Sequence, residues 1–131
     1  MPAKLLISDE TVGGERSRSW ELELPAERLS VRELIRSRIY QEVQDFNVRC
    51  AQDFVGLIQP EGAEKILNGW RLKKHRALDW KRQFELALEA FEANQVVILA
   101  DDRQVESLDE EIVIRSDSQV VFLRLAMLAG G

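Results

Sequence analysis

The residues best placed to do chemistry are the last two, Gly130 and Gly131, which follow an apolar stretch at residues 120–125. A carboxylate is inert toward amines and thiols until one oxygen becomes a better leaving group, as ATP-dependent adenylation achieves. Glycine suits a narrow nucleotide site because it has no side chain and adopts conformations that other residues resist. A partner's cysteine thiolate can then form a thioester, and a sulfur donor a thiocarboxylate. Gly131 is therefore the candidate reactive residue. The segment that a partner must bind before it consists of Met127, Leu128 and Ala129.

No other group of residues indicates a catalytic or metal site. The only histidine, His75, lies in a basic run at 71–76, which we interpret as a solvated loop or the approach to a helix or, alternatively, as a docking patch for an acidic partner. The only cysteine, Cys50, predicts a small buried residue rather than a nucleophile. The acidic clusters at 101–102 and 109–111 are typical of turns and connections. We expect no enzyme activity, no metal and no cofactor.

The bulk composition is that of an ordinary globular domain. With 131 residues and 45% hydrophobic content, the chain predicts one domain over residues 1–131. Its longest apolar runs fall far below the ~20 residues of a membrane span, and its start lacks a signal-peptide core, so we expect a cytoplasmic protein without a membrane partner. The net charge of −5 argues against a nucleic-acid partner.

The first fifty residues predict a hairpin followed by a helix. Residues 5–7 are apolar and residues 20–24 alternate apolar with charged side chains, which is the strand period. Ser30 and Glu33 fit a capping box at the start of the helix. The helix's apolar stripe consists of Val31, Leu34, Ile35, Ile39, Val43 and Phe46. Its intervening charged residues are interpreted as a solvated face: Arg32, Glu33, Arg36, Arg38 and Glu42.

The segment 50–95 predicts a second helix, capped by Asp79. The helical spacing there is carried by Phe84, Ala87, Leu88 and Phe91. Earlier in the segment, the stretches 54–58 and 66–70 are apolar but short, and their pattern does not decide between strand and loop.

The last thirty-six residues return to strands. Residues 96–100 are β-branched and precede a tight turn at 101–103, a short strand and a final strand. Alternation divides the final strand into two sets. We expect the core set to be Val121, Leu123 and Leu125. The possible partner surface is then Val120, Phe122 and Arg124. In the alternative, the segment 50–95 covers this second set and buries Phe122.

This order of elements resembles the β-grasp fold of the ubiquitin-like family, which includes ubiquitin, the small subunit of molybdopterin synthase and the thiamine-pathway sulfur carrier. The resemblance covers residues 1–49 and 96–131, and is strongest at 97–108 and at 122–125 with the terminal glycines. The chain is also similar to larger bacterial ubiquitin-like proteins that end in diglycine. The resemblance implies an α+β class, with a mixed sheet packed on a helix and residues 50–95 as an insertion carrying a second helix.

The resemblance also implies a role as a protein modifier. An activating enzyme would use ATP to adenylate Gly131, a conjugating enzyme would carry the thioester, and an amine of a target protein would receive an isopeptide bond. A metal-dependent deconjugating peptidase is a further expected partner. Two alternatives stay open: a sulfur carrier that ends as a thiocarboxylate, and a non-covalent β-grasp interaction module.

Overall fold

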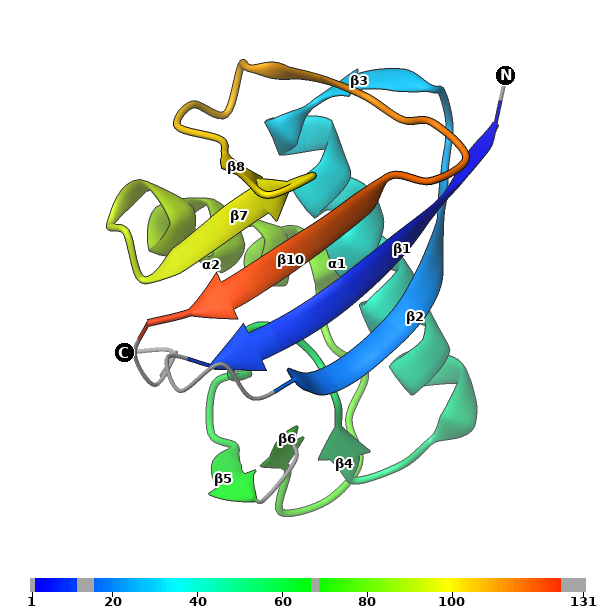
Figure 1. Cartoon of the computed structure of the whole chain (residues 1–131). Coiled ribbons are helices and arrows are strands. Elements are labelled where there is room, and N and C mark those ends of the chain that lie inside the picture. Colours follow the sequence, from blue (N-terminus) through cyan, green and yellow to red (C-terminus); the bar gives the residue numbers. More distant parts are fainter. Residues whose placement is uncertain (1, 12–15, 67–68, 126–131) are drawn as a thin grey trace.

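The computed structural model describes residues 2–11, 16–66 and 69–125. In this part of the chain, two helices pack on one face of a five-stranded mixed sheet (Figure 1), in agreement with the expected α+β class. The elements are β1 (Ala3–Thr11), β2 (Arg16–Leu24), β3 (Arg28–Ser30), α1 (Val31–Arg49), β4 (Asp53–Phe54), β5 (Glu64–Ile66), β6 (Gly69–Arg71), α2 (Trp80–Glu92), β7 (Val96–Ala100), β8 (Arg103–Gln104), β9 (Glu111–Val113) and β10 (Gln119–Arg124).

The five-stranded sheet has the order β2-β1-β10-β7-β8. Strands β1 and β2 form the expected antiparallel hairpin, and β7 pairs antiparallel with β10. Strand β10 lies parallel to β1, with Ile7 opposite Val120. Parallel neighbours require a long crossover, which here comprises the whole chain between the hairpin and β10. The first and last strands therefore pair at the centre of the sheet.

Helix α1 begins with the capping box that the sequence predicts. The Ser30 hydroxyl accepts a hydrogen bond from the Glu33 backbone N–H at 3.1 Å, and the Glu33 carboxylate accepts one from the Ser30 backbone N–H at 3.1 Å. The two bonds satisfy donors that the first helical turn leaves without partners. The predicted apolar stripe is buried along its whole length, so the stripe packs α1 onto the sheet.

Helix α2 follows Asp79, whose carboxylate accepts a hydrogen bond from the Lys81 backbone N–H at 3.0 Å, as predicted. The helix packs against α1 and β7. Ala87 and Phe91 are buried, whereas Phe84 and Leu88 are half-buried. Part of the predicted stripe is therefore fully buried, and the rest packs against the core while partly exposed.

The two undecided stretches contribute to a small sheet with the order β4-β6-β5. Phe54 lies in β4 and Trp70 in β6, and these two residues are paired. Residues 56–58, by contrast, lie outside the strands. A further two-stranded sheet pairs β3 with β9. The sequence pattern does not reveal it because both strands are only three residues long.

The predicted turn at residues 101–103 connects β7 to β8. Asp101 and Asp102 both have positive φ angles, of 49° and 69°, a conformation that aspartate tolerates better than most residues. The Asp101 carboxylate also accepts a hydrogen bond from the Gln119 backbone N–H at 2.9 Å. These contacts explain the acidic pair by turn geometry. Among the described residues, no helix has the length and apolar character needed to cross a membrane.

Replacing Gly56 by alanine tests the packing between the segment after β4 and α1. The added Cβ would lie 2.5 Å from the Glu42 Oε2 and inside the van der Waals radius of the buried Phe54 ring. We expect Gly56→Ala to lower the free energy of unfolding by about 1–3 kcal/mol in urea denaturation. The matched control, Gly62→Asn, lies where a side chain has open space and φ is +77°, which asparagine tolerates. Equal stabilities for the two variants would contradict the close approach.

Candidate functional site

The proposed reactive tail follows β10, at the centre of the sheet. The backbone N–H of Leu125 donates to the Gln95 carbonyl at 3.0 Å, so the pairing with the chain before β7 continues one residue past the strand. The predicted site residues beyond this point lie outside the described residues: Met127, Leu128, Ala129, Gly130 and Gly131. The structure thus describes the strand from which the tail departs.

The predicted core set of β10 is wrong, whereas the burial of Phe122 that the alternative expects is confirmed, with Arg38 of α1 over its ring. Val120 and Phe122 are buried, with exposed fractions of 1% and 0%, and face α1. Arg124 is half-buried, and Leu125, predicted as core, is 42% exposed. Both alternating sets are apolar over residues 120–123, so the strand's own pattern cannot choose between faces. The choice follows from pairing, because Val120 lies opposite Ile7 and Phe122 opposite Asp9 on the side that α1 covers.

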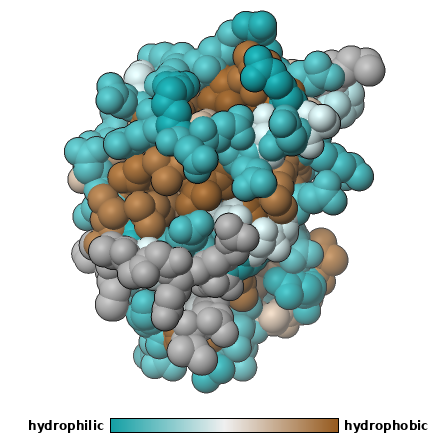
Figure 2. All heavy atoms as spheres, in the orientation of Figure 1, coloured by the Kyte–Doolittle hydropathy of each residue, from teal (hydrophilic) through white to brown (hydrophobic). Residues whose placement is uncertain are grey.

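The side of the sheet away from the helices carries an apolar surface. We call it the outer face, and it consists of Leu6, Val97, Leu99, Val121 and Leu123. Leu123 lies opposite Val97 and Val121 opposite Leu99, so these side chains form a continuous block. Figure 2 shows apolar atoms gathered across the middle of this side. The β10 side chains on the open side of the sheet are therefore Val121 and Leu123, rather than the predicted Val120 and Phe122.

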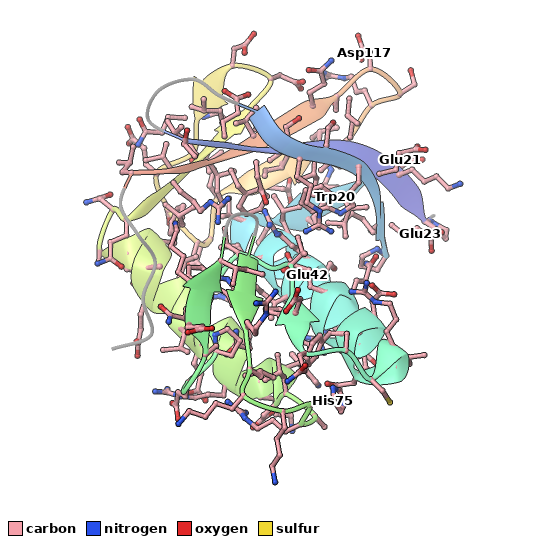
Figure 3. All side chains as sticks on the ribbon, turned by 90° about the horizontal axis from the view of Figure 1, so that it is seen from below. Trp20, Glu21, Glu23, Glu42, His75 and Asp117 are labelled. Atoms are coloured by element: carbon pink, nitrogen blue, oxygen red, sulfur yellow. The ribbon has the colours of Figure 1, made fainter. Side chains whose placement is uncertain are left out.

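Acidic side chains border the outer face along β2. Glu21 is paired with Leu6 and Glu23 with Lys4, and both glutamates are exposed at the edge of the sheet (Figure 3). An apolar block with a charged border has the composition of a protein-docking surface, because the apolar centre supplies affinity and the border supplies specificity. Such a surface is suited to non-covalent binding.

Beneath the sheet lies a buried ionic cluster centred on Arg38. The guanidinium is fully buried and binds Asp9 through two contacts, Nη1 to Oδ1 at 2.5 Å and Nη2 to Oδ2 at 2.7 Å. Its Nε donates to Glu42, one turn along α1. The second Glu42 oxygen accepts the backbone N–H of Leu57 at 3.0 Å. The cluster therefore joins β1, α1 and the segment after β4.

Aromatic rings line the Arg38 guanidinium. The ring centre of Phe122 lies 4.5 Å from the guanidinium carbon and that of Trp20 lies 4.8 Å away. Arg18 stacks on Trp20 at 3.9 Å and donates to the Val55 carbonyl at 3.3 Å. Trp20 and Glu42 both lie on the helix side of the sheet (Figure 3). Cation–π contacts of this kind add to the ion pairs, and they connect β10 to the cluster through Phe122.

Burial and pairing act in opposite directions on the charges of the cluster. Burial raises the pKa of the Glu42 carboxyl, and the attraction of Arg38 only partly opposes this effect. Burial alone would lower the pKa of Arg38, but Glu42 and Asp9 raise it, so Arg38 keeps its proton. Burial lowers the pKa of Arg18. Arg38 is thus a permanent charge, and burial opposes the ionisation of Glu42.

Two further expectations need correction. Cys50 is exposed rather than buried, because it caps α1 in a left-handed conformation with φ of 54° where the helix leaves the core. His75 lies in the loop that approaches α2, as one interpretation expects, but it is half-buried rather than solvated: its ring packs on Phe46 with centres 5.2 Å apart, and its Nδ1 lies 2.6 Å from the Ala51 carbonyl. Among the described residues, no group of histidine, cysteine or acidic side chains could hold a metal ion.

The sequence interpretation also missed Arg38 and Glu42, which it placed on the solvated face. Their spacing of four residues matches a helical ion pair, and Asp9 continues the inner-face alternation of Leu5 and Ile7. Two features of the sequence could therefore have revealed the cluster. Asp9 stands at the end of an apolar alternation, and Arg38 is close to the apolar stripe of the helix. Only the packing of β1 on α1 brings them together.

Removing Arg38 tests the electrostatic cost of the cluster. Arg38→Met leaves the buried Asp9 and Glu42 carboxylates without their counter-ion, so we expect a loss of about 3–5 kcal/mol in the free energy of unfolding. Arg28→Met is the matched control, because Arg28 pairs with Glu111 at 2.6 Å on the surface, and its loss costs less than about 1 kcal/mol. Adding Glu42→Gln to Arg38→Met should recover part of the loss in urea denaturation. Similar losses for the two single variants would refute the buried counter-ion role.

The raised pKa of Glu42 predicts a pH dependence of stability. Because the folded state holds the proton more tightly than the unfolded state, this contribution is present below the ordinary value of 4.5 and is lost as pH rises through the folded-state pKa. Each unit of elevation corresponds to about 1.4 kcal/mol. Relative to Glu42→Gln, the unmodified chain should therefore lose stability as pH increases above 4.5. Urea denaturation of both proteins across this range is the measurement, and a constant difference between them would exclude the effect.

The candidate site thus consists of the outer face, the end of β10 and the ionic cluster beneath them. Comparisons of the chain with protein-family models, with curated proteins and with solved structures found no match.

Proposed function

We propose that the chain is a ubiquitin-like modifier with a β-grasp fold and that its reactive group is the carboxylate of Gly131. The observation that carries the proposal is the strand order β2-β1-β10-β7-β8, with β10 parallel to β1 at the centre and α1 across one face. This is the arrangement expected of a β-grasp domain. It supports the proposal because the candidate tail then follows a central strand that neighbours hold on both sides.

The proposed chemistry has three steps: one activates the Gly131 carboxylate, and the next two replace the leaving group at its carbonyl carbon. A carboxylate oxygen attacks the α-phosphorus of ATP on the activating enzyme, and pyrophosphate leaves. The thiolate of a partner cysteine then displaces AMP and forms a thioester. Finally, an amine of a target protein displaces the thiolate, loses a proton and forms an amide bond. The chain is a substrate throughout, ATP is consumed by its partner, and the chemistry requires a free carboxylate at Gly131.

The outer face supports a recognition step before this chemistry. Leu123 lies two residues before Leu125, where the described chain ends, so a partner bound to the outer face is close to the start of the tail. We propose that the activating enzyme docks there through apolar contacts. Conjugating enzymes and a metal-dependent deconjugating peptidase are further proposed partners.

The outer face also favours a second candidate function, that of a non-covalent interaction module. Such a module needs the apolar block but not the tail. A sulfur carrier would use the same first step as a modifier, after which a sulfur donor attacks the acyl-adenylate. These functions separate by product: a modifier appears in covalent adducts through Gly131, a sulfur carrier gains sulfur in exchange for oxygen, and a module shows neither change in intact-mass analysis.

Activation at Gly131 is tested with a candidate activating enzyme and ATP, with pyrophosphate exchange and thioester formation as the measurements. Deleting Gly131 should abolish both products, because the remaining carboxylate is one residue too short for the nucleotide site. Adding one alanine after Gly131 should abolish them too, since the reactive carbonyl is then displaced. Activation that persists in both variants would reject Gly131 as the reactive residue, while binding that survives both changes would favour the non-covalent module.

Docking through the outer face is tested with Leu123→Ser. Loss of the apolar side chain should reduce the activation rate at limiting substrate by about tenfold, which corresponds to about 1.4 kcal/mol of binding free energy. Val113→Ser is the matched control, because Val113 is an exposed apolar residue on β9, outside the five-stranded sheet. Circular dichroism should show that both variants are folded. Equal activation rates for the two would argue against docking at this face.

A further inference from the structure

The helical side of the molecule carries an exposed group of aromatic rings that the proposed chemistry does not use. Tyr40 on α1 and Trp80 at the start of α2 meet edge to face, with ring centres 5.2 Å apart. Phe84, one turn along α2, lies 6.3 Å from Trp80. Tyr40 is 41% exposed, and the other two rings are half-buried. The rings therefore pack on one another across the helix boundary while keeping part of their surface in solvent.

Arg36 completes this group. Its guanidinium carbon lies 5.0 Å from the centre of the Trp80 ring, which holds the side chain over the aromatic surface. Arg36 is exposed, and among the described residues it has no ion-pair partner. We call Arg36, Tyr40, Trp80 and Phe84 the aromatic–arginine surface. The Trp80 ring positions the Arg36 guanidinium, and the N–H groups of Arg36 remain available to a ligand.

The Tyr40 hydroxyl supplies a second donor, from the residue one helical turn after Arg36. Gln44 donates from Nε2 to the hydroxyl oxygen at 3.2 Å, so the oxygen is occupied as an acceptor and its own proton is free to donate elsewhere. The exposed Lys81 adds positive charge next to Trp80. Charge at this surface is thus complementary to a carboxylate, and the adjoining rings are complementary to an apolar side chain.

The composition of this surface is that of a binding hot spot. Tryptophan, tyrosine and arginine are enriched where single residues dominate the affinity of protein interfaces. The mutual packing of the rings also lowers the conformational entropy lost on binding. The surface lies on the helical side of the sheet, opposite the outer face (Figure 1), so a partner there would leave the outer face free.

We propose that the aromatic–arginine surface binds a segment of a partner protein that presents an aspartate or glutamate carboxylate beside an apolar side chain. The carboxylate receives hydrogen bonds from Arg36 and Tyr40, and the apolar side chain packs on Trp80 and Phe84. Charge complementarity selects this partner, because the charged group held over the Trp80 ring, Arg36, is a cation without an ion-pair partner among the described residues. This binding does not depend on the chemistry proposed for Gly131.

The test uses a short, fluorescently labelled peptide of alternating leucine and glutamate, with the full chain titrated into it and anisotropy as the readout. Arg36→Gln should weaken binding about tenfold, because it removes a charge-assisted hydrogen-bond donor. Tyr40→Phe should weaken it about two- to fivefold through loss of the hydroxyl alone. The matched control is Arg49→Gln, because Arg49 is an exposed arginine on the same helix that pairs with Asp45. This control should bind like the unmodified chain.

Two further probes decide between ligand classes. A peptide of alternating leucine and lysine should not bind, because its charge opposes Arg36. Aromatic rings beside arginine also stack on nucleobases, so labelled oligothymidylate is the second probe. The proposal is overturned by absence of saturable binding to the glutamate peptide, by equal effects of the Arg36 and Arg49 substitutions, or by tighter binding of either alternative probe. Thermal melting of each variant confirms that losses of binding do not come from unfolding.

Discussion

The structure depends on the compensation of buried charge around Arg38. A guanidinium with no exposed surface can persist only where carboxylates surround it, and Asp9 and Glu42 meet this requirement from β1 and from the next turn of α1. The cluster also fixes the segment after β4, because the second Glu42 oxygen accepts a hydrogen bond from the Leu57 backbone N–H. One cation therefore determines how the helix lies on the sheet and where the segment after β4 meets both.

The same cluster links the interior to the central strand. Phe122 lies over the Arg38 guanidinium, so the inner side of β10 belongs to the core and its outer side is left for Val121 and Leu123. The packing of the interior and the apolar outer face are thus two consequences of one strand orientation. The pairing of β10 with β1 and β7 extends this order to the point from which the proposed tail departs.

Local patterns predicted the elements well. The capping box of α1, the Asp79 cap of α2, the hairpin and the aspartate turn are all present because each depends on residues close together in the chain. Predictions failed where distant residues decide the outcome. The β10 faces are the clearest case, since both sets of side chains are apolar, and Cys50 and Arg38 show that helix position alone does not predict burial. The aromatic–arginine surface likewise requires two helices that are thirty residues apart to meet.

Local patterns were enough to predict the elements, their order and the two glycines after the last strand, because backbone preferences and hydrophobic periods act over a few residues. Tertiary structure alone decided which charges are buried, which face of β10 is open and which aromatic rings meet. The physical reason is that burial belongs to the packed chain: a side chain loses its water only when segments far apart in sequence close around it, as β1, α1 and the segment at Leu57 do around Arg38 and Glu42.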